Sequence, residues 1–360
     1  MISSTALAAR AATGSVAAHA TFEEAFGFYR DSGFLYPRKL AELEQRLPAI
    51  EQTWRTLLDC DHDVFRFVAR RDRGRGPLRN AICAFAYAGQ TWQGQHLVSA
   101  VRHEYAGTLA VLSELVLQFQ RSGAQFARLS FRPTNPGTNR LFGAVAEQLP
   151  AHLTHMSVVD YGFCPVREFR PAPMSARDVL VRRAADGEQE RAAGFFSRVL
   201  SAPEFGSLAL DDLDLREIDE RYRAHGLTRR RRVLLAESAG EVIGGCLIHD
   251  CSPGVNFSFL ENAVEHLHID ERLGERDRLR VWHALARAAV AEVSQERDWI
   301  VVALDRHDRA TATAARLVPP EPKQYAVLTV DGAESGFLRS IDCFRAYYDF
   351  LVARNRQRSA

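Results

Sequence analysis

Acidic and histidine side chains alternate along residues 261–270, a stretch predicted to be a β-strand that runs into a turn. His266, His268 and Asp270 share one face, because successive side chains of a strand point to opposite sides. Two histidines and a carboxylate could hold a metal ion, but we favour a solvated strand end and predict no metal. Glu265 lies on the other face, where it could remove a proton from an attacking amine as a general base. An ion-paired carboxylate is the alternative interpretation.

His96 is the second candidate base. It lies on a predicted strand over 91–101, on the same face as Trp92, whose ring could stack on a planar ligand or pack in the core. Tyr105 follows this strand, where its phenol could act as a general acid or simply pack in the turn.

Asn135, Asn139 and Arg140 open a further predicted helix and are candidate ligand contacts. Capping of that helix by the Asn135 side chain is the competing interpretation of the first of them.

Arginine supplies nearly all of the positive charge, since Lys39 and Lys323 are the only lysines of the chain. The clusters Arg70–Arg75 and Arg229–Arg232 lie in or beside predicted hairpins, where charged side chains discourage edge-to-edge strand pairing. Binding of a polyphosphate or a cyclic dinucleotide is the alternative, because planar guanidinium groups fit phosphates.

One supersecondary unit occurs twice in the sequence. Strand, turn, helix, strand and helix follow one another over 95–142, and again over 261–317, at an offset of about 170 residues. A strand that opens into a helix N-terminus is a ready site for an anionic group, so both copies are candidate phosphate sites.

The elements before each repeat also correspond. Helices are predicted over 22–34 and 38–58 and strands over 64–71, 78–87 and 91–101. In the second half we expect a strand over 179–184, helices over 188–200 and 215–225, and strands over 232–238, 241–250 and 256–269. An amphipathic helix is predicted over 340–356.

Composition is that of an ordinary globular protein, with 46% hydrophobic residues, 25% charged residues and a net charge of +1. This balance gives no general attraction to nucleic acid. The six cysteines have no C-x-x-C spacing, so neither a zinc site nor a disulfide framework is expected. The N-terminal stretch lacks the apolar core of a signal peptide, and no apolar run is long enough to span a membrane. We therefore expect a cytoplasmic protein.

The order of helices, three-strand meander, strand, helix, strand and helix resembles the GNAT acyltransferase fold in both halves. NPGTNRLF at 135–142 is similar to the family's Asn-x-x-Ala-x-x-Leu-Tyr/Phe pattern. The resemblance implies transfer of an acyl group from a thioester to an amine by direct attack, with a base on the fourth strand.

The glycine-rich turn that holds coenzyme A in such enzymes is degenerate in both halves. In VRHEYAGTLAV (101–111), Glu104, Tyr105 and Gly107 match the family, but Leu109 and Val111 replace the later glycines. In IDERLGERDRL (269–279), Gly274 is kept and arginines occupy the glycine positions. Side chains there obstruct the close approach of backbone N–H groups to a pyrophosphate.

We therefore predict an α/β protein of two tandem GNAT-like domains, residues 20–166 and 176–335. A frayed or disordered tail (1–19), a linker (167–175) and a C-terminal helix (336–360) complete the chain. The predicted function is N-acyl transfer with a noncanonical donor pocket, and a noncatalytic sensor of a phosphorylated small molecule such as a cyclic dinucleotide is the alternative. No tightly bound cofactor is expected; acyl-CoA or another acyl thioester is the expected co-substrate, and a protein partner or homodimer is possible. The residues expected at the donor are Val101, His103, Gly107, Thr108, Asn135, Asn139, Arg140 and Gly274, and those expected in catalysis are Glu265, His96 and Tyr105.

Overall fold

The structure is a computed structural model, which describes residues 16–17, 20–60, 63–72, 76–101, 104–166, 178–185, 187–210, 215–294, 299–305 and 323–359. His103, the expected linker at 167–175 and the expected helix at 306–317 lie outside these residues.

The first half opens on a short strand and three helices, continues through a meander, and closes on a helix–strand–helix–strand unit. Its elements are β1 (Val16–Ala17), α2 (Phe22–Asp31), α3 (Pro37–Glu44), α4 (Leu47–Asp59), β2 (Phe65–Arg71), β3 (Leu78–Ala88), β4 (Thr91–Ser99), α5 (Tyr105–Arg121), β5 (Phe126–Phe131), α6 (Pro136–Gln148) and β6 (Thr154–Pro165).

The described elements of the second half follow the same order. Its elements are β7 (Leu180–Arg183), α7 (Gln189–Val199), α8 (Ala202–Leu208), α9 (Leu215–Ala224), β8 (Arg229–Ser238), β9 (Glu241–Cys251), η2 (Leu260–Asn262), β10 (Ala263–Ile269), α10 (Glu275–Ser294), β11 (Trp299–Asp305) and β12 (Lys323–Asp331). After it come η4 (Ala333–Ser335) and the long C-terminal helix α12 (Gly336–Ser359).

All of the described strands join in one sheet with the order β1-β2-β3-β4-β5-β12-β6-β11-β10-β9-β8-β7. Equivalent strands of the two halves follow in the same order from either edge, so the sheet has an internal two-fold repeat. The last strand of each half is exchanged: β12 lies beside β5 of the first half, and β6 lies beside β11 of the second. The exchanged strands pair with each other, antiparallel, at the centre.

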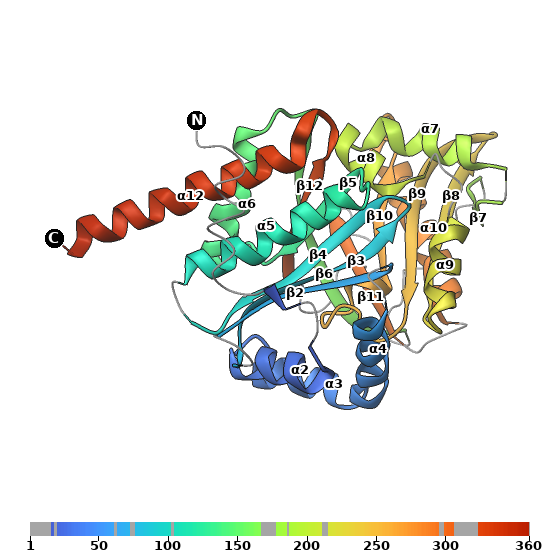
Figure 1. Cartoon of the computed structure of the whole chain (residues 1–360). Coiled ribbons are helices and arrows are strands. Elements are labelled where there is room, and N and C mark those ends of the chain that lie inside the picture. The colour runs from blue at the N-terminus through green and yellow to red at the C-terminus, as the bar shows by residue number, and fades with distance from the viewer. Residues whose placement is uncertain are drawn as a thin grey trace.

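Helices cover both halves of the sheet (Figure 1). Helix α5 packs across β2, β3 and β4, and α12 packs on α5 and α6, while α10 packs against β8 to β11. Helices α2, α3 and α4 lie on the other side of the first-half strands from α5, where α4 packs against β2 and α2 against β3. The main hydrophobic core runs through both halves, and a second cluster lies beneath α10 around Trp282 and Leu285.

Local chemistry explains where several elements begin and end. Thr21 and Glu24 form a capping box at the start of α2, which closes at Ser32 before Gly33 takes a left-handed conformation with φ of 76°. The single helix predicted over 38–58 is two helices, α3 and α4, with a break at Gln45 and Arg46. Pro48 explains the break, because it lacks the N–H that a helix interior requires and fits only a first turn.

Two further differences concern the second half. The strand predicted over 256–269 begins only at Ala263, after a loop and the turn η2. The short helix α8, which the sequence analysis did not predict, starts at a Ser201 cap whose hydroxyl accepts from the Glu204 N–H. No described helix is long and apolar enough to cross a membrane.

Candidate functional site

Strands β4 and β5 pair side by side for only four residues. Their parallel register runs from Thr91 opposite Phe126 to Gly94 opposite Leu129, and the strands then separate. A β-bulge begins at the same point: the register between β3 and β4 shifts after Gln95, and His96 has a φ of 56°. Because a positive φ is uncommon for a residue with a side chain, the bulge is a specific feature of β4 and bends it away from β5.

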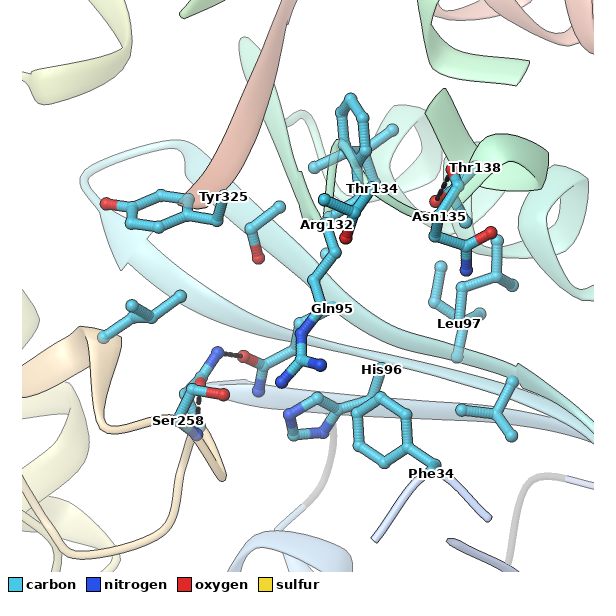
Figure 2. Close-up of a pocket in the computed structure, with 18 of the residues that line it drawn as sticks. Phe34, Gln95, His96, Leu97, Arg132, Thr134, Asn135, Thr138, Ser258 and Tyr325 are labelled. Carbon is cyan, nitrogen blue, oxygen red and sulfur yellow. Dashed lines mark hydrogen bonds between the residues drawn. The ribbon is translucent and has the colours of Figure 1, made fainter. Parts of the chain in front are cut away.

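The separated strands enclose a cavity of about 510 Å³, here called the splay cavity. Its walls are residues 95–99 of β4, residues 129–131 of β5 with Arg132 just after it, the start of α6, residues 32–36 and residues 256–260 of the second half. Figure 2 shows Arg132 reaching into this space, with His96 and Phe34 below it in the view and Asn135 and Thr138 to one side. Its volume falls within the range of small-molecule sites.

Gln95 holds a loop of the second half against the wall of the splay cavity by two hydrogen bonds. Its amide accepts a hydrogen bond from Asn256 and donates one to the Val255 carbonyl oxygen, both at 2.5 Å. The first-half site is therefore completed by residues of the second half.

His96 is buried in an aromatic cage at the bulge. Its ring stacks on Phe257 at a centroid distance of 4.8 Å and meets the edge of Tyr29 at 5.6 Å. Burial, with a smaller contribution from the charge of Lys39, holds the pKa of His96 well below its usual range. The imidazole is therefore neutral at pH 7, and its Nε2 lies 3.5 Å from the Phe257 N–H.

A second cavity of about 450 Å³ adjoins the first and is here called the basic cavity. The two share a set of lining residues, here called the throat: Tyr36, Lys39, Arg132, Tyr161 and Ser258. Beyond the throat, the basic cavity is lined by charged side chains of α3 and of neighbouring segments, namely Arg38, Glu42, Arg46 and Lys323.

Lys39 is the buried cation of the throat. The residue is 4% exposed, and its Nζ lies 4.3 Å from the centroid of the Phe34 ring. Burial, reinforced by the positive charges of Arg132 and Lys323 and opposed by Glu42, lowers the pKa of Lys39 to about 7. An amine in this state can give or take a proton near neutral pH.

The second half repeats the bulge but not the cavity. His266 occupies the position equivalent to His96 and has a φ of 51°, and β10 and β11 pair for only two residues before they separate. The space between them is about 20 Å³, because side chains fill it. The Glu204 side chain enters this space from α8, the Arg128 side chain from β5 and the Tyr325 side chain from the exchanged strand β12.

Glu265 belongs to this closed space. Its carboxylate accepts a hydrogen bond from the Tyr87 hydroxyl and lies 2.9 Å from Nε2 of His249. Burial alone would raise the pKa of Glu265, but His249, His266 and the Arg128 guanidinium more than offset it and hold that pKa well below its usual range. Glu265 therefore holds the halves together as a buried anion and lines no described open cavity.

The arginine run 229–232 does not form a solvated edge, which corrects the preferred interpretation of the sequence. Arg229 and Arg231 are 0% and 3% exposed, although β7 pairs with β8 only from Leu234 to Glu237, because α9 packs on β8 and the face that carries both side chains is turned into the core. Arg229 donates to the Tyr87 carbonyl oxygen and pairs with Glu261 at 3.1 Å, while Arg230 pairs with Asp250.

The other residues expected at the site lie in different places. Asn135 lines the splay cavity and caps α6 by accepting from the Gly137 N–H. None of Val101, Tyr105, Gly107, Thr108, Asn139, Arg140 and Gly274 lines either cavity. Gly107 packs on a side chain, since a Cβ there would lie 2.0 Å from Oδ1 of Asn80.

Four throat residues with ionisable side chains were not among the expected site residues: Tyr36, Lys39, Arg132 and Tyr161. The rarity of lysine was a usable signal, because both lysines of an arginine-rich chain line one cavity. Among the described residues, no group of three or more His, Cys, Asp and Glu side chains is arranged to hold a metal.

In both halves the fourth and fifth strands separate, the fourth strand carries a bulge and the last strand is exchanged. These features define the chain as a tandem GNAT-fold protein. No protein-family model and no curated protein sequence matches it. Among solved structures, it is similar to a tandem GNAT protein from the clavulanic acid biosynthesis pathway, with 12% identity over 80% of this chain and 94% of that chain and a TM-score of 0.42. It is also similar to a GCN5-related N-acetyltransferase from Sphaerobacter thermophilus, with 12% identity, 79% and 85% coverage and a TM-score of 0.45.

Proposed function

We propose that the first half is an N-acyltransferase site that takes an acyl thioester in the splay cavity and transfers the acyl group to an amine. The observation that carries this proposal is the difference between the halves: the same splayed strand pair opens on about 510 Å³ in the first and about 20 Å³ in the second. An N-acyltransferase fold with one open and one filled site favours a single active half.

The backbone of β4 supports the binding of an extended donor. Beyond Gly94 no residue of β4 has a partner in β5, and His96 and Leu97 have no partner in β3. An amide-containing arm could lie beside β4 as an added strand, and its hydrogen bonds would be to backbone groups. A backbone N–H at the bulge could then stabilise the oxygen that becomes negative during attack.

The donor is proposed to need no diphosphate cradle. Helix α5 begins after Glu104, whose carboxylate pairs with Arg70 at 3.3 Å, and Asn80 fills the space beside Gly107. The first turns of this helix also carry Leu109 and Val111 where the family has its later glycines, so they lack the close backbone approach that a diphosphate needs. A pantetheine thioester, free or on an acyl carrier, suits the site better than one whose affinity depends on the phosphates of coenzyme A.

The sensor alternative loses support at the arginine run 229–232. This run, for which phosphate binding was the alternative interpretation, has Arg229 and Arg231 turned inward and Arg230 paired with Asp250.

Turnover with simple donors tests the proposal. Octanoyl-N-acetylcysteamine and octanoyl-CoA are supplied with a panel of amines, and thiol release is measured. Thr138→Trp should abolish release, because Thr138 lines the splay cavity at the start of α6 and an indole there would fill the space. Thr138→Ala is the matched control, because it removes the same hydroxyl and leaves the cavity open. Absence of thiol release with every amine, together with a thermal shift by nucleotides alone, would favour the sensor.

A further inference from the structure

The basic cavity carries an excess of positive charge. Five cationic side chains line it, from Arg38, Lys39, Arg46, Arg132 and Lys323, against the single carboxylate of Glu42. Glu42 is already shared between Lys323 at 3.2 Å and Arg38 at 3.5 Å. Because like charges gathered around a concave space repel one another, such a cavity favours an anionic ligand.

The basic cavity adjoins the splay cavity at the throat, whose residues line both. Lys39 lines both cavities, and Tyr36, which accepts a hydrogen bond from Arg132 at 3.0 Å, lies beside it. A molecule bound in the basic cavity can therefore present one end to a thioester in the splay cavity. The rest of that molecule would remain among the cationic side chains of the basic cavity.

We propose that the acceptor is an amine carrying a carboxylate, that it binds in the basic cavity, and that Lys39 takes up its proton as the amine attacks the thioester. This inference rests on the proposed function, and it names the acceptor class and the base of that site.

The reaction is balanced within this geometry. The amine nitrogen forms a bond to the thioester carbonyl carbon, the carbon–sulfur bond breaks, and the sulfur leaves as a thiolate. The proton lost by the nitrogen passes to Lys39 Nζ and then to the thiolate. The products are an amide and a free thiol, and no oxidant or further reactant takes part.

Lys39 fits the role of base better than that of nucleophile. Attack by Lys39 on the donor would leave a stable amide on its side chain and end turnover after one reaction. Its pKa near 7, caused by burial and by the neighbouring cations, leaves a large neutral fraction at physiological pH. The titratable and charged groups around it come from several elements: Arg132 just after β5, Tyr36 just before α3, Tyr161 on β6, Lys323 on β12, Glu42 on α3 and the neutral His96 on β4.

Binding tests the acceptor class without turnover. The twenty L-amino acids and their C-terminal amides form matched pairs that differ only in the carboxylate. They are titrated calorimetrically against the full chain saturated with octanoyl-N-acetylcysteamine. At least one acid should bind about tenfold or more tightly than its amide, and Lys323→Met should remove most of this preference. Equal affinity for acids and amides throughout would overturn the acceptor class.

The two-lysine composition makes the base directly observable. Reductive ¹³C-methylation of the protein gives one NMR signal for each lysine, and Lys323→Arg assigns them. The Lys39 signal should titrate near pH 7. Lys39→Arg keeps the charge but has no neutral form available, so it should bind the donor and the acid normally while turnover falls about 10²- to 10⁴-fold. The rise of turnover through pH 7 should disappear with it.

The outcomes separate the two proposals. Failure of any thioester to bind the wild-type chain contradicts the proposed function. Normal thioester binding and turnover with an unchanged pH profile in Lys39→Arg overturns the role of Lys39 alone. A mass increase of one acyl group on Lys39 after incubation with the donor would make it a nucleophile and also overturn the base.

Discussion

At the scale of single residues, a reversal of charge distinguishes the open splay cavity of the first half from the filled space at the equivalent place in the second half. Lys39 and Glu204 are each the third residue after the helix cap, in α3 and in the equivalent α8. Glu204 lies 3.2 Å from His155 and 3.8 Å from His266, so it draws side chains into the second splay. Lys39 instead lies near two further cations, Arg132 and Lys323, and the repulsion between these charges helps to keep the splay cavity open.

Lys39 should make the protein less stable than a neutral residue would. Its pKa is lowered in the folded state, so the folded chain binds fewer protons than the unfolded chain between about pH 7 and pH 10. We expect Lys39→Met to raise the free energy of unfolding at pH 7 by on the order of a few kcal/mol, with a gain that shrinks toward pH 10. Urea unfolding at both pH values measures it, with Lys323→Met as the control. A loss of stability at pH 7 would show that the amine has a partner that compensates for its burial.

Glu265 should contribute stability in the opposite sense. Its pKa is lowered in the folded state despite its burial, so the contribution is present above the unfolded pKa near 4 and is lost as the pH falls through the folded value. Glu265→Gln leaves Arg128 and Arg231 with one anion fewer and should destabilise the fold by about 3 kcal/mol at pH 7. Thermal unfolding over pH 3 to 8 tests this. Donor affinity in the same variant should be unchanged. A loss of donor affinity would indicate that Glu265 takes part in the donor site.

At the scale of elements, the start of α5 bears on the donor class that we propose. The anionic Glu104 at the helix start and the Asn80 side chain against Gly107 leave no glycine cradle for a diphosphate. Octanoyl-pantetheine should therefore bind within about threefold of octanoyl-CoA, a difference of less than 1 kcal/mol. Competition binding compares the two, and a loss of a hundredfold or more on removing the phosphates would show that a cradle exists.

Much of the element order was predictable from the sequence, because local patterns carry it. The three-strand meander and α5 follow from strand alternation and helical periodicity, and the repeat at about 170 residues predicts the second copy. The break at Pro48 and the late start of β10 after η2 were missed. A proline two residues into α4 could have indicated the first, whereas no local pattern marks the second.

At the scale of the whole molecule, exchange of β6 and β12 makes one sheet of two halves. Sequence cannot show this, because each strand pairs across the boundary with residues far away along the chain, as Val327 does with Ser130 and Ser157. The site depends on it: Lys39 comes from the first half and Lys323 from the second, and neither reveals the other in the sequence. Only the rarity of lysine pointed to them.

The exchange predicts that the halves need each other. A fragment of residues 1–166 lacks β12, which leaves the inner edge of β5 unpaired and the core around Phe131 and Leu328 incomplete. We expect this fragment to aggregate or to lack cooperative unfolding, and co-expression with residues 167–360 to restore a folded complex. Circular dichroism and size-exclusion chromatography of each fragment and of the mixture test it. A cooperatively folded 1–166 fragment would contradict the role given to the exchange.

The number and place of donor sites test the account most directly. Calorimetric titration of octanoyl-CoA should show one site per chain, because one splay is open and the other is filled. Thr138→Trp should abolish binding, while Gly274→Arg, whose added side chain meets nothing within 4 Å, should leave it unchanged. Two sites per chain, or one site that survives Thr138→Trp, would contradict the assignment of the donor to the first half.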